Sequence, residues 1–190
     1  MKKPLFTVSA DWHLTPQNLE MKRELVQQIV RYNKGNKIDC HICCGDIFNV
    51  RKSQELSTLL GFQSILETFN EEQIILRAIP GNHDKVSYIS EESYLDVYEQ
   101  DQYFQLYRDV RVSSKLDEAG RVEVFYLPYF DEEKLYGEYL QKVVRLAGET
   151  ENQELKRVLI THIAIDGVKN NDYATVSNSL KKELFDVFDL

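Results

Sequence analysis

The chain has 190 residues, 43% of them hydrophobic, which suits one globular domain with its own core. A net charge of −8 argues against a stand-alone nucleic-acid coat protein, and no apolar stretch approaches the ~20 residues that span a bilayer. Three cysteines do not make a disulfide framework, so a reducing compartment is expected, with a cytoplasmic location and no membrane partner.

Strand-like apolar runs alternate with helical periods along the chain. In chain order, the expected elements are strands at 5–9, 40–44, 73–79, 110–113, 122–127 and 157–161 and helices at 19–34, 53–70, 91–102, 132–146 and 179–185. Gly35 is expected to end the first helix, Ser53 to cap the second, and a turn near 117–120 to join two strands. The apolar segment FDVFDL at 185–190 looks like a further strand. This alternation predicts an α/β fold in which helices cover parallel strands.

Polar side chains follow four of the expected strands at the point where each strand ends. The set is Asp11, His13, Asp46, Asn49, Asn82, His83, Asp84 and His162. Ligands collect at the carboxyl ends of parallel strands, where the loops meet. A single Asp or His in a loop is most often part of a capped turn, but the joint pattern predicts one shared site.

These residue types suit a pair of divalent metal ions. Carboxylate and amide oxygens and imidazole nitrogens accept Mn²⁺, Fe or Zn²⁺, and no cysteine lies beyond a strand end, which disfavours a structural zinc site. Gly45 and Gly81, directly before Asp46 and Asn82, allow the backbone to approach the metals closely. A single carboxylate such as Asp46, set between the other groups, can bridge two ions.

The segments DWH, GDIFN, GNHD and TH, in this order, resemble the first four motifs of the calcineurin-like metallophosphoesterase superfamily. Within it, SADWHL, GDIFNVRK and IPGNHD are most similar to the SbcD-type DNA repair nucleases and to the phage recombination endonuclease subunits. The resemblance covers residues 5 to about 163. It implies a metallophosphoesterase-type sandwich of two mixed β-sheets flanked by helices, with the metals at the strand ends.

The resemblance also implies a role for each motif residue. Asp11 and His13 would bind the first metal, and Asp46 would bridge both. The second metal would be bound by Asn82 and His162. Two such ions, most simply Mn²⁺ with Mg²⁺, Fe or Zn²⁺ as alternatives, would activate water for in-line attack on phosphorus.

The remaining motif residues would act on the substrate or support those that do. His83 would stabilise the transition state or protonate the leaving oxygen, and Asp84 would hold the His83 ring by a hydrogen bond. Many family members have Asp or His where this chain has Asn49, which cannot ionise and is therefore expected to orient His83. Arg51 and Lys52 either contact phosphate or belong to a solvated turn.

Two other patterns are attributed to packing. Cys40 and Cys43 resemble a CxxC pair, but alternate strand residues face opposite sides, so they are expected to be core residues, as is His41. The aromatic residues of VFYLPYF and DQYFQLY could stack on bases, but core and interface packing is the preferred explanation.

The function expected from these motifs is a metal-dependent DNA exo- or endonuclease that acts on phosphodiesters with an SbcC-type ATPase in DNA repair or recombination. A small-molecule phosphodiesterase or phosphatase is one alternative, and a catalytically weak scaffold that binds metal or DNA is another. Helical faces such as 56–66 could form a homodimer or belong to the core.

The superfamily's fifth motif, Gly-His-x-His, supplies one more histidine to each metal. No histidine follows His162 in this sequence. Residues 1–190 are therefore expected to form a nuclease core without that motif and without a capping or ATPase-docking region. Such a core is expected to fold, to bind metal weakly, and to be poorly active or inactive alone.

Overall fold

The computed structural model describes residues 4–86, 92–117, 120–130, 133–149, 155–171, 174–177 and 180–189. Contacts divide the chain into two compact units, Met1–Arg108 and Asp109–Leu190, each with its own sheet and core. Among the described residues, none of the helices combines the length and apolarity that crossing a bilayer requires.

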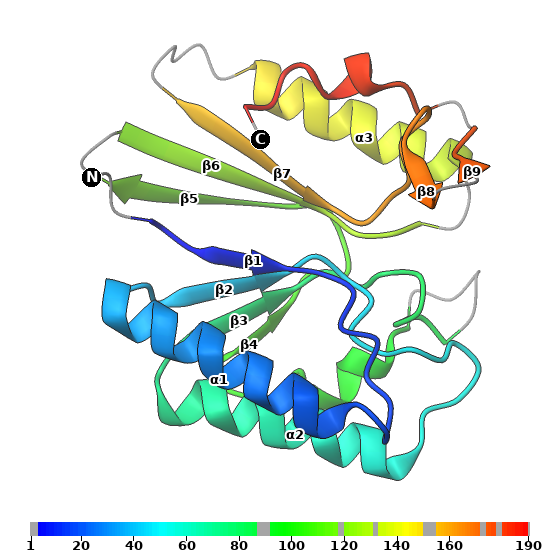
Figure 1. The fold of residues 1–190 in the computed structure, drawn as a ribbon. Coiled ribbons are helices and arrows are strands. Elements are labelled where there is room, and N and C mark those ends of the chain that lie inside the picture. The colour runs from blue at the N-terminus through cyan, green and yellow to red at the C-terminus, as the bar shows by residue number, and fades with distance from the viewer. Residues whose placement is uncertain are drawn as a thin grey trace. The chain divides into compact units, whose positions relative to one another are not determined.

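The first unit is a parallel sheet with two long helices on one side of it (Figure 1). Its strands pair in chain order, β1-β2-β3-β4, and all three pairings are parallel. Its elements are β1 (Thr7–Ser9), α1 (Leu19–Asn36), β2 (Cys40–Cys43), α2 (Leu56–Glu71), β3 (Ile75–Ala78), the 3-10 helix η1 (Tyr94–Tyr98) and β4 (Phe104–Leu106).

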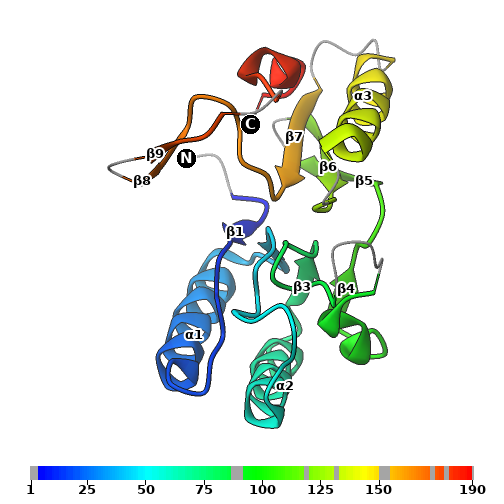
Figure 2. The ribbon, with the colours of Figure 1, turned by 90° about the vertical axis from the view of Figure 1, so that its right-hand side faces the viewer.

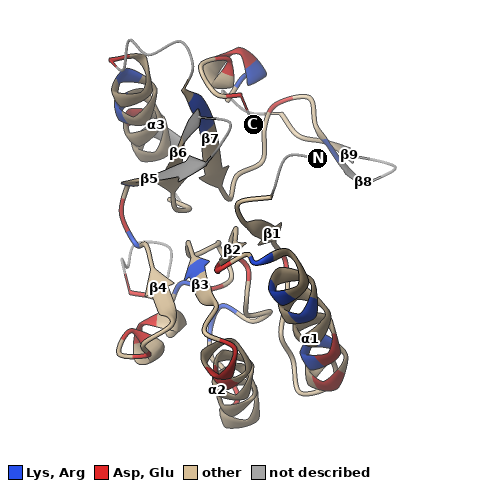
Figure 3. Cartoon of the chain, turned by 90° about the vertical axis from the view of Figure 1, so that its left-hand side faces the viewer, with Lys and Arg blue, Asp and Glu red and all other residues tan. Residues whose placement is uncertain are grey.

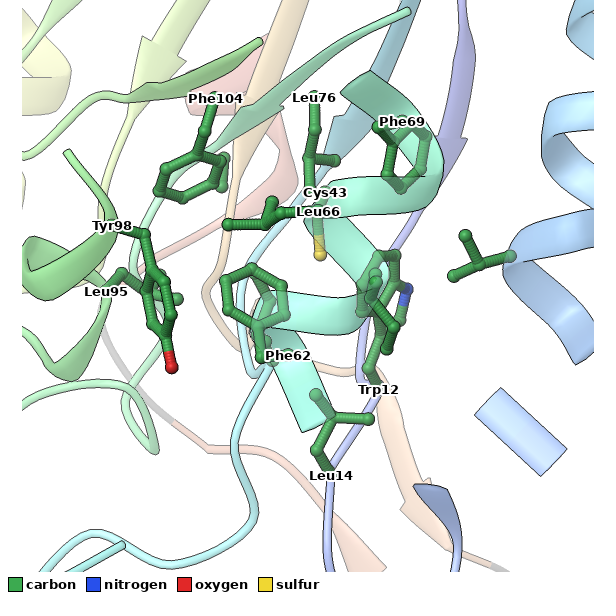
Figure 4. Close-up of a cluster of buried hydrophobic side chains, with 14 of the residues drawn as sticks. Trp12, Leu14, Cys43, Phe62, Leu66, Phe69, Leu76, Leu95, Tyr98 and Phe104 are labelled. Carbon is green, nitrogen blue, oxygen red and sulfur yellow. The ribbon is translucent and has the colours of Figure 1, made fainter. Parts of the chain in front are cut away.

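The helices form because each presents an apolar stripe to the sheet. α1 buries Val26 and Val30, four residues apart, and α2 buries Phe62, Leu66 and Phe69. These side chains pack with residues of the sheet and the strand-end loops in one cluster, part of which is shown in Figure 4. This cluster fixes the helices against the sheet whose strand ends carry the predicted site.

The second unit is a mixed sheet covered by one helix (Figure 2). β5 (Arg111–Asp117) pairs antiparallel with β6 (Gly120–Leu127), and β6 pairs parallel with β7 (Lys156–Thr161). The unit also contains α3 (Glu133–Gly148), the hairpin of β8 (Lys169–Asn171) and β9 (Ala174–Thr175), and the 3-10 helix η2 (Lys182–Phe185). α3 buries one stripe, formed by Tyr136, Leu140, Val143 and Ala147.

The prediction of an α/β fold with two sheets flanked by helices is confirmed, and the expected strands and long helices are found with bounds shifted by a few residues. The turn expected near 117–120 is consistent with the pairing of Asp117 with Gly120, while residues 118 and 119 lie outside the described residues. The strands β4, β8 and β9 were not predicted.

Five local predictions were wrong. α1 continues through Gly35 and ends at Asn36, where Lys37 is the C-cap and takes the left-handed conformation with φ 56°. α2 begins at Leu56 with Glu55 as its N-cap, so Ser53 caps nothing. The helix expected at 91–102 is a 3-10 turn at Tyr94–Tyr98, and the one expected at 179–185 is likewise a 3-10 turn at Lys182–Phe185. The strand expected at 185–190 is not found among its described residues, 185–189, which end η2 and continue into a turn.

Candidate metal centre

In the turn after β1, buried apolar residues alternate with two predicted metal ligands. Trp12 and Leu14 are buried in the core, whereas Asp11 is exposed and His13 is half-buried. Asp11 and His13 both have positive φ angles, 55° and 45°. For residues with a Cβ this conformation costs about 1 kcal/mol or more, and such strain concentrates at functional sites. Burial of the two apolar residues holds the turn in this shape.

Backbone hydrogen bonds tie this turn to the loop after β2. The Asp11 N–H donates to the Gly45 carbonyl at 3.1 Å, and the His13 N–H donates to the Asp46 carbonyl at 3.0 Å. Leu14 continues the pairing through an N–H bond of 2.8 Å to the carbonyl of Ile47. The parallel pairing of β1 with β2 therefore extends past the strand ends, and it brings the DWH and GDIFN segments side by side.

The turn after β3 contacts the loop after β2 through Asp46. The His83 N–H donates to Oδ1 of Asp46 at 2.8 Å, and Asp46 itself is only 4% exposed with φ 54°. A Cβ added to Gly81 would lie 2.2 Å from Oδ1 of Asp46 and 2.4 Å from its nitrogen. The sequence predicted that Gly81 allows a close approach to the metals, and the structure shows that its backbone lies directly against Asp46.

The side chains of the three turns converge. Nε2 of His13 lies 3.6 Å from Oδ1 of Asp11 and 4.0 Å from Oδ2 of Asp46. Ligand atoms of His13, Asp46 and His83 all lie within 4.8 Å of one another. The distances from Nε2 to the carboxylates exceed the usual hydrogen-bond length of about 2.7–3.2 Å but suit groups that surround one ion at ~2.1 Å.

The donor set fits a divalent metal. Carboxylate oxygens and imidazole nitrogens are ligands that Mn²⁺, Fe and Zn²⁺ accept. The buried Nδ1 of His13 also has no hydrogen-bond partner, although its ring lies edge-on to the His83 ring with centroids 5.1 Å apart. Asp11, His13 and Asp46 would hold such an ion, and His83 is within reach of the same point.

Asp84 binds backbone groups and not the His83 ring. One carboxylate oxygen accepts the Phe48 N–H and the other accepts the Gly81 N–H, each at 2.9 Å. Burial raises the pKa of Asp84 to about 6, although the two N–H donors act in the opposite direction. The predicted Asp84–His83 hydrogen bond was wrong because the carboxylate is fully buried under the loops, where only backbone donors reach it.

The His83 ring is oriented by a backbone carbonyl. Nδ1 of His83 donates a hydrogen bond to the carbonyl oxygen of Asn49. A carbonyl oxygen only accepts, so Nδ1 carries the proton and Nε2 is the atom that can take up or release one. The ring is thus held by the backbone of position 49, through an atom that every residue type has, and the orienting role expected of the Asn49 side chain stays a prediction.

The other predicted residues occupy less constrained places. Asn82 is half-buried on the turn after β3, next to His83. Arg51 and Lys52 precede α2 by several residues, and the carbonyl of Arg51 accepts the Tyr94 hydroxyl at 3.0 Å. His162 directly follows β7 in the second unit, and its ring lies edge-on to Tyr129 with centroids 6.4 Å apart. The roles assigned to these residues stay predictions.

Cys40 and Cys43 belong to the core, as predicted. Cys40 and Cys43 are buried on β2, and all three cysteines are free thiols. Burial raises the pKa of Cys44 to about 12 and that of Cys43 well above its usual value. Neither thiol is therefore ionised at neutral pH in the metal-free protein, so neither is suited to act as a nucleophile.

Carboxylates and histidines gathered at the ends of parallel strands are typical of enzymes that hold divalent metal ions. Residues 4–186 match the family model described as calcineurin-like phosphoesterase, and the chain belongs to this family. Divalent metal ions are therefore its expected cofactors.

Two known proteins are similar to this chain. Exonuclease subunit 1 of Enterobacteria phage T4 is 37% identical over 79 residues, a match that covers 39% of this chain and 23% of that protein. The matched segment is thus about a quarter of the curated relative. The crystal structure of a dimetal phosphatase from Danio rerio aligns with a TM-score of 0.58 at 9% identity, over 87% of this chain and 71% of that one. At this identity the second similarity shows the fold alone.

Proposed function

We propose that this chain is the catalytic core of a metal-dependent DNA nuclease that hydrolyses phosphodiester bonds in DNA repair or recombination. The observation that carries the proposal is the convergence of Asp11, His13, Asp46 and His83 where three parallel strands end. DNA is the proposed substrate because the segments SADWHL, GDIFNVRK and IPGNHD resemble SbcD-type nucleases. Similarity to a phage exonuclease subunit supports the same choice.

The motif residues have different proposed roles. Two divalent metals, when bound, would activate water and neutralise charge on the phosphate oxygens. Asp11, His13 and Asp46 would hold the first ion, and the resemblance assigns Asn82 and His162 to the second. We propose Mn²⁺ as the natural metal.

His83 is the proposed proton donor to the leaving oxygen. Its Nδ1 donates to the Asn49 carbonyl, so the protonated ring would present Nε2–H to the substrate. Its backbone N–H meanwhile donates to Asp46, which fixes the ring next to the proposed metal ligand. The two contacts give His83 both a defined protonation site and a defined place.

Charge does not identify the surface that meets DNA. Figure 3 shows Lys, Arg, Asp and Glu interspersed along α1. Arg51 and Lys52, close to the motif residues in sequence, are the proposed phosphate contacts. An SbcC-type ATPase is the proposed partner, and a homodimer is proposed through Leu56 and Leu60 of α2, which are 70% and 60% exposed.

The proposal is tested by incubating the chain with Mn²⁺ and three substrates: single-stranded DNA, blunt duplex DNA and a nitrophenyl phosphodiester. We expect slow cleavage of DNA, as befits a core without the fifth motif, and we expect Asp46→Asn and His83→Gln to abolish it while both variants stay folded by circular dichroism. Cleavage of the nitrophenyl ester without any cleavage of DNA would favour the small-molecule phosphodiesterase. Metal or DNA binding without turnover, unaffected by either substitution, would favour the scaffold.

A further inference from the structure

His41, in the middle of β2, is fully buried, yet both of its ring nitrogens have polar partners. Nδ1 lies 2.7 Å from Oγ1 of Thr7, and Nε2 lies 2.8 Å from Oγ of Ser9. The ring is stacked between Trp12, with centroids 6.2 Å apart, and Phe69, with centroids 5.8 Å apart. All of these neighbours are uncharged. A core position that is merely filled does not need two matched hydroxyl groups.

The partners of His41 form a chain of hydrogen bonds with one direction. The Thr7 hydroxyl donates to Oδ1 of Asn33 at 2.9 Å, so Oγ1 of Thr7 is left to accept from Nδ1–H of His41. Nε2 then accepts the hydroxyl proton of Ser9. The Ser9 oxygen in turn accepts Nε1–H of Trp12 at 2.8 Å. Every link is satisfied by a single neutral tautomer of His41.

The far end of this chain lies inside the proposed metal turn. Trp12 stands between Asp11 and His13, both of which have positive φ angles. Its indole is 2% exposed and packs edge-on against Phe62, as Figure 4 shows. Since Trp12 points into the core, its neighbours on either side must point outward. The orientation of the indole therefore decides how Asp11 and His13 are presented.

We propose that His41 is a positioning residue for the metal turn, acting through Ser9 and Trp12 to hold Asp11 and His13 in their strained conformation. The inference rests on the proposed function, because it assigns His41 to the same site. Burial lowers the pKa of His41 to about 4, so the ring is neutral at pH 7, as the direction of the hydrogen bonds requires.

The test uses the fact that Trp12 is the only tryptophan in the chain, so its indole N–H gives a single NMR signal. His41→Leu removes the ring, and Ser9→Ala removes only the middle link. In the metal-free protein we expect the indole N–H of both variants to exchange with solvent faster than in the unaltered chain. By calorimetry, we expect Mn²⁺ affinity to fall by about 10–100-fold, the usual effect of removing a residue that supports a metal ligand. Ser9→Thr keeps the hydroxyl, so its indole N–H exchange and its Mn²⁺ affinity should both match those of the unaltered chain.

Leu66→Ala is the matched control. Leu66 is buried in the same cluster but takes no part in the hydrogen-bonded chain. It should destabilise the core yet change Mn²⁺ affinity by much less than about tenfold. Unchanged indole exchange in Ser9→Ala would overturn the inference, and so would an equal loss of affinity in Leu66→Ala.

A failure of the proposed function would look different. If the unaltered chain bound no Mn²⁺, the nuclease proposal would be contradicted. The inference would then be decided by exchange of the Asp11 and His13 amide protons, which are bonded to the loop after β2. Faster exchange of these two amides in Ser9→Ala would support positioning of the turn, and unchanged exchange would refute it.

Discussion

Gly81 lies so close to Asp46 that no larger residue fits without displacing it. Gly81→Ala would place a methyl group 2.2 Å from Oδ1 of Asp46. We expect a loss of about 1–3 kcal/mol in the free energy of unfolding and weaker Mn²⁺ binding, because the Asp46 carboxylate, a proposed metal ligand, must move. Urea unfolding and calorimetry measure the two effects.

Gly35→Ala is the control for this substitution. Gly35 lies within α1, and a Cβ there meets nothing within 4 Å. Alanine should stabilise the helix by about 0.5–1 kcal/mol and leave metal binding unchanged. Gly81→Ala protein with full stability and normal Mn²⁺ affinity would show that the turn after β3 adapts easily.

Asn49 offers a second test at the scale of one residue. Because His83 is held by the carbonyl of Asn49, the identity of the side chain should matter little. Asn49→Ala is expected to keep kcat for DNA cleavage within about threefold of the unaltered chain, well short of the ~10²–10⁴-fold that general acid–base catalysis contributes. A fall in kcat as large as that of His83→Gln would show that the Asn49 side chain supports His83.

The depressed pKa of His41 predicts a pH dependence of stability. The unfolded chain takes up a proton near pH 6.5, whereas folded His41 does so only near pH 4. Stability is therefore complete above pH 6.5 and falls between pH 6.5 and 4, by about 3 kcal/mol in all. Urea unfolding of the unaltered chain and of His41→Gln isolates this effect, since carboxyl groups titrate in both. Parallel pH profiles would contradict a neutral buried ring.

At the scale of elements, Asp84 fastens three segments together. Its carboxylate accepts N–H groups from the loops after β2 and β3, and its own carbonyl accepts the Tyr94 N–H at the start of η1. In Asp84→Asn only one side-chain oxygen remains, so Phe48 or Gly81 loses its acceptor. We expect a loss of about 1–3 kcal/mol in the free energy of unfolding and weaker Mn²⁺ binding, measured as above.

Asp101→Asn separates these two effects. Asp101 also accepts two hydrogen bonds in the first unit, from the Tyr103 N–H and from Nδ2 of Asn70. Its replacement should lower stability without changing metal affinity. If both variants weakened Mn²⁺ binding equally, the effect of Asp84 would be attributed to stability alone.

Periodicity predicts an element where one sequence pattern continues long enough. α1 and α3 repeat their buried residues over several turns and were predicted close to their observed bounds. Tyr94–Tyr98 buries only Leu95 and Tyr98, a single turn, which is why a full helix was wrong there. β4 has only three residues, too few for an alternating pattern to be visible.

The site, too, could be predicted only where the sequence carries a local pattern. Asp11, His13, Asp46 and His83 were predictable because each directly follows a strand, and parallel strands bring their ends together. The partners of Asp84, by contrast, are backbone atoms of loops distant in sequence. The support of Trp12 by His41 depends on a contact between β1 and β2 that no local pattern records, apart from hydroxyls two residues apart at Thr7 and Ser9.

At the scale of the whole molecule, the first unit, Met1–Arg108, contains all of the converging groups His13, Asp46 and His83. That unit has its own four-stranded sheet, two helices that cover it and a continuous apolar cluster. Among the residues that the structure describes, the buried members of this cluster extend no further than Phe104, and Leu106 packs against them. The requirements for independent folding are therefore met within one stretch of chain.

A fragment of residues 1–108 is accordingly expected to fold and to bind Mn²⁺ through Asp11, His13 and Asp46. Unfolding in urea, followed by the fluorescence of Trp12, should be cooperative, because the indole is buried in the cluster that holds the unit together. The fragment lacks His162, so it should bind one ion by calorimetry, whereas a full chain that uses His162 as the resemblance implies should bind two. The fragment variant Asp46→Asn is the control and should fold but bind no ion. A gradual transition without a baseline would show that the first unit needs the second to fold, and equal stoichiometry in fragment and full chain would remove His162 from the proposed ligands.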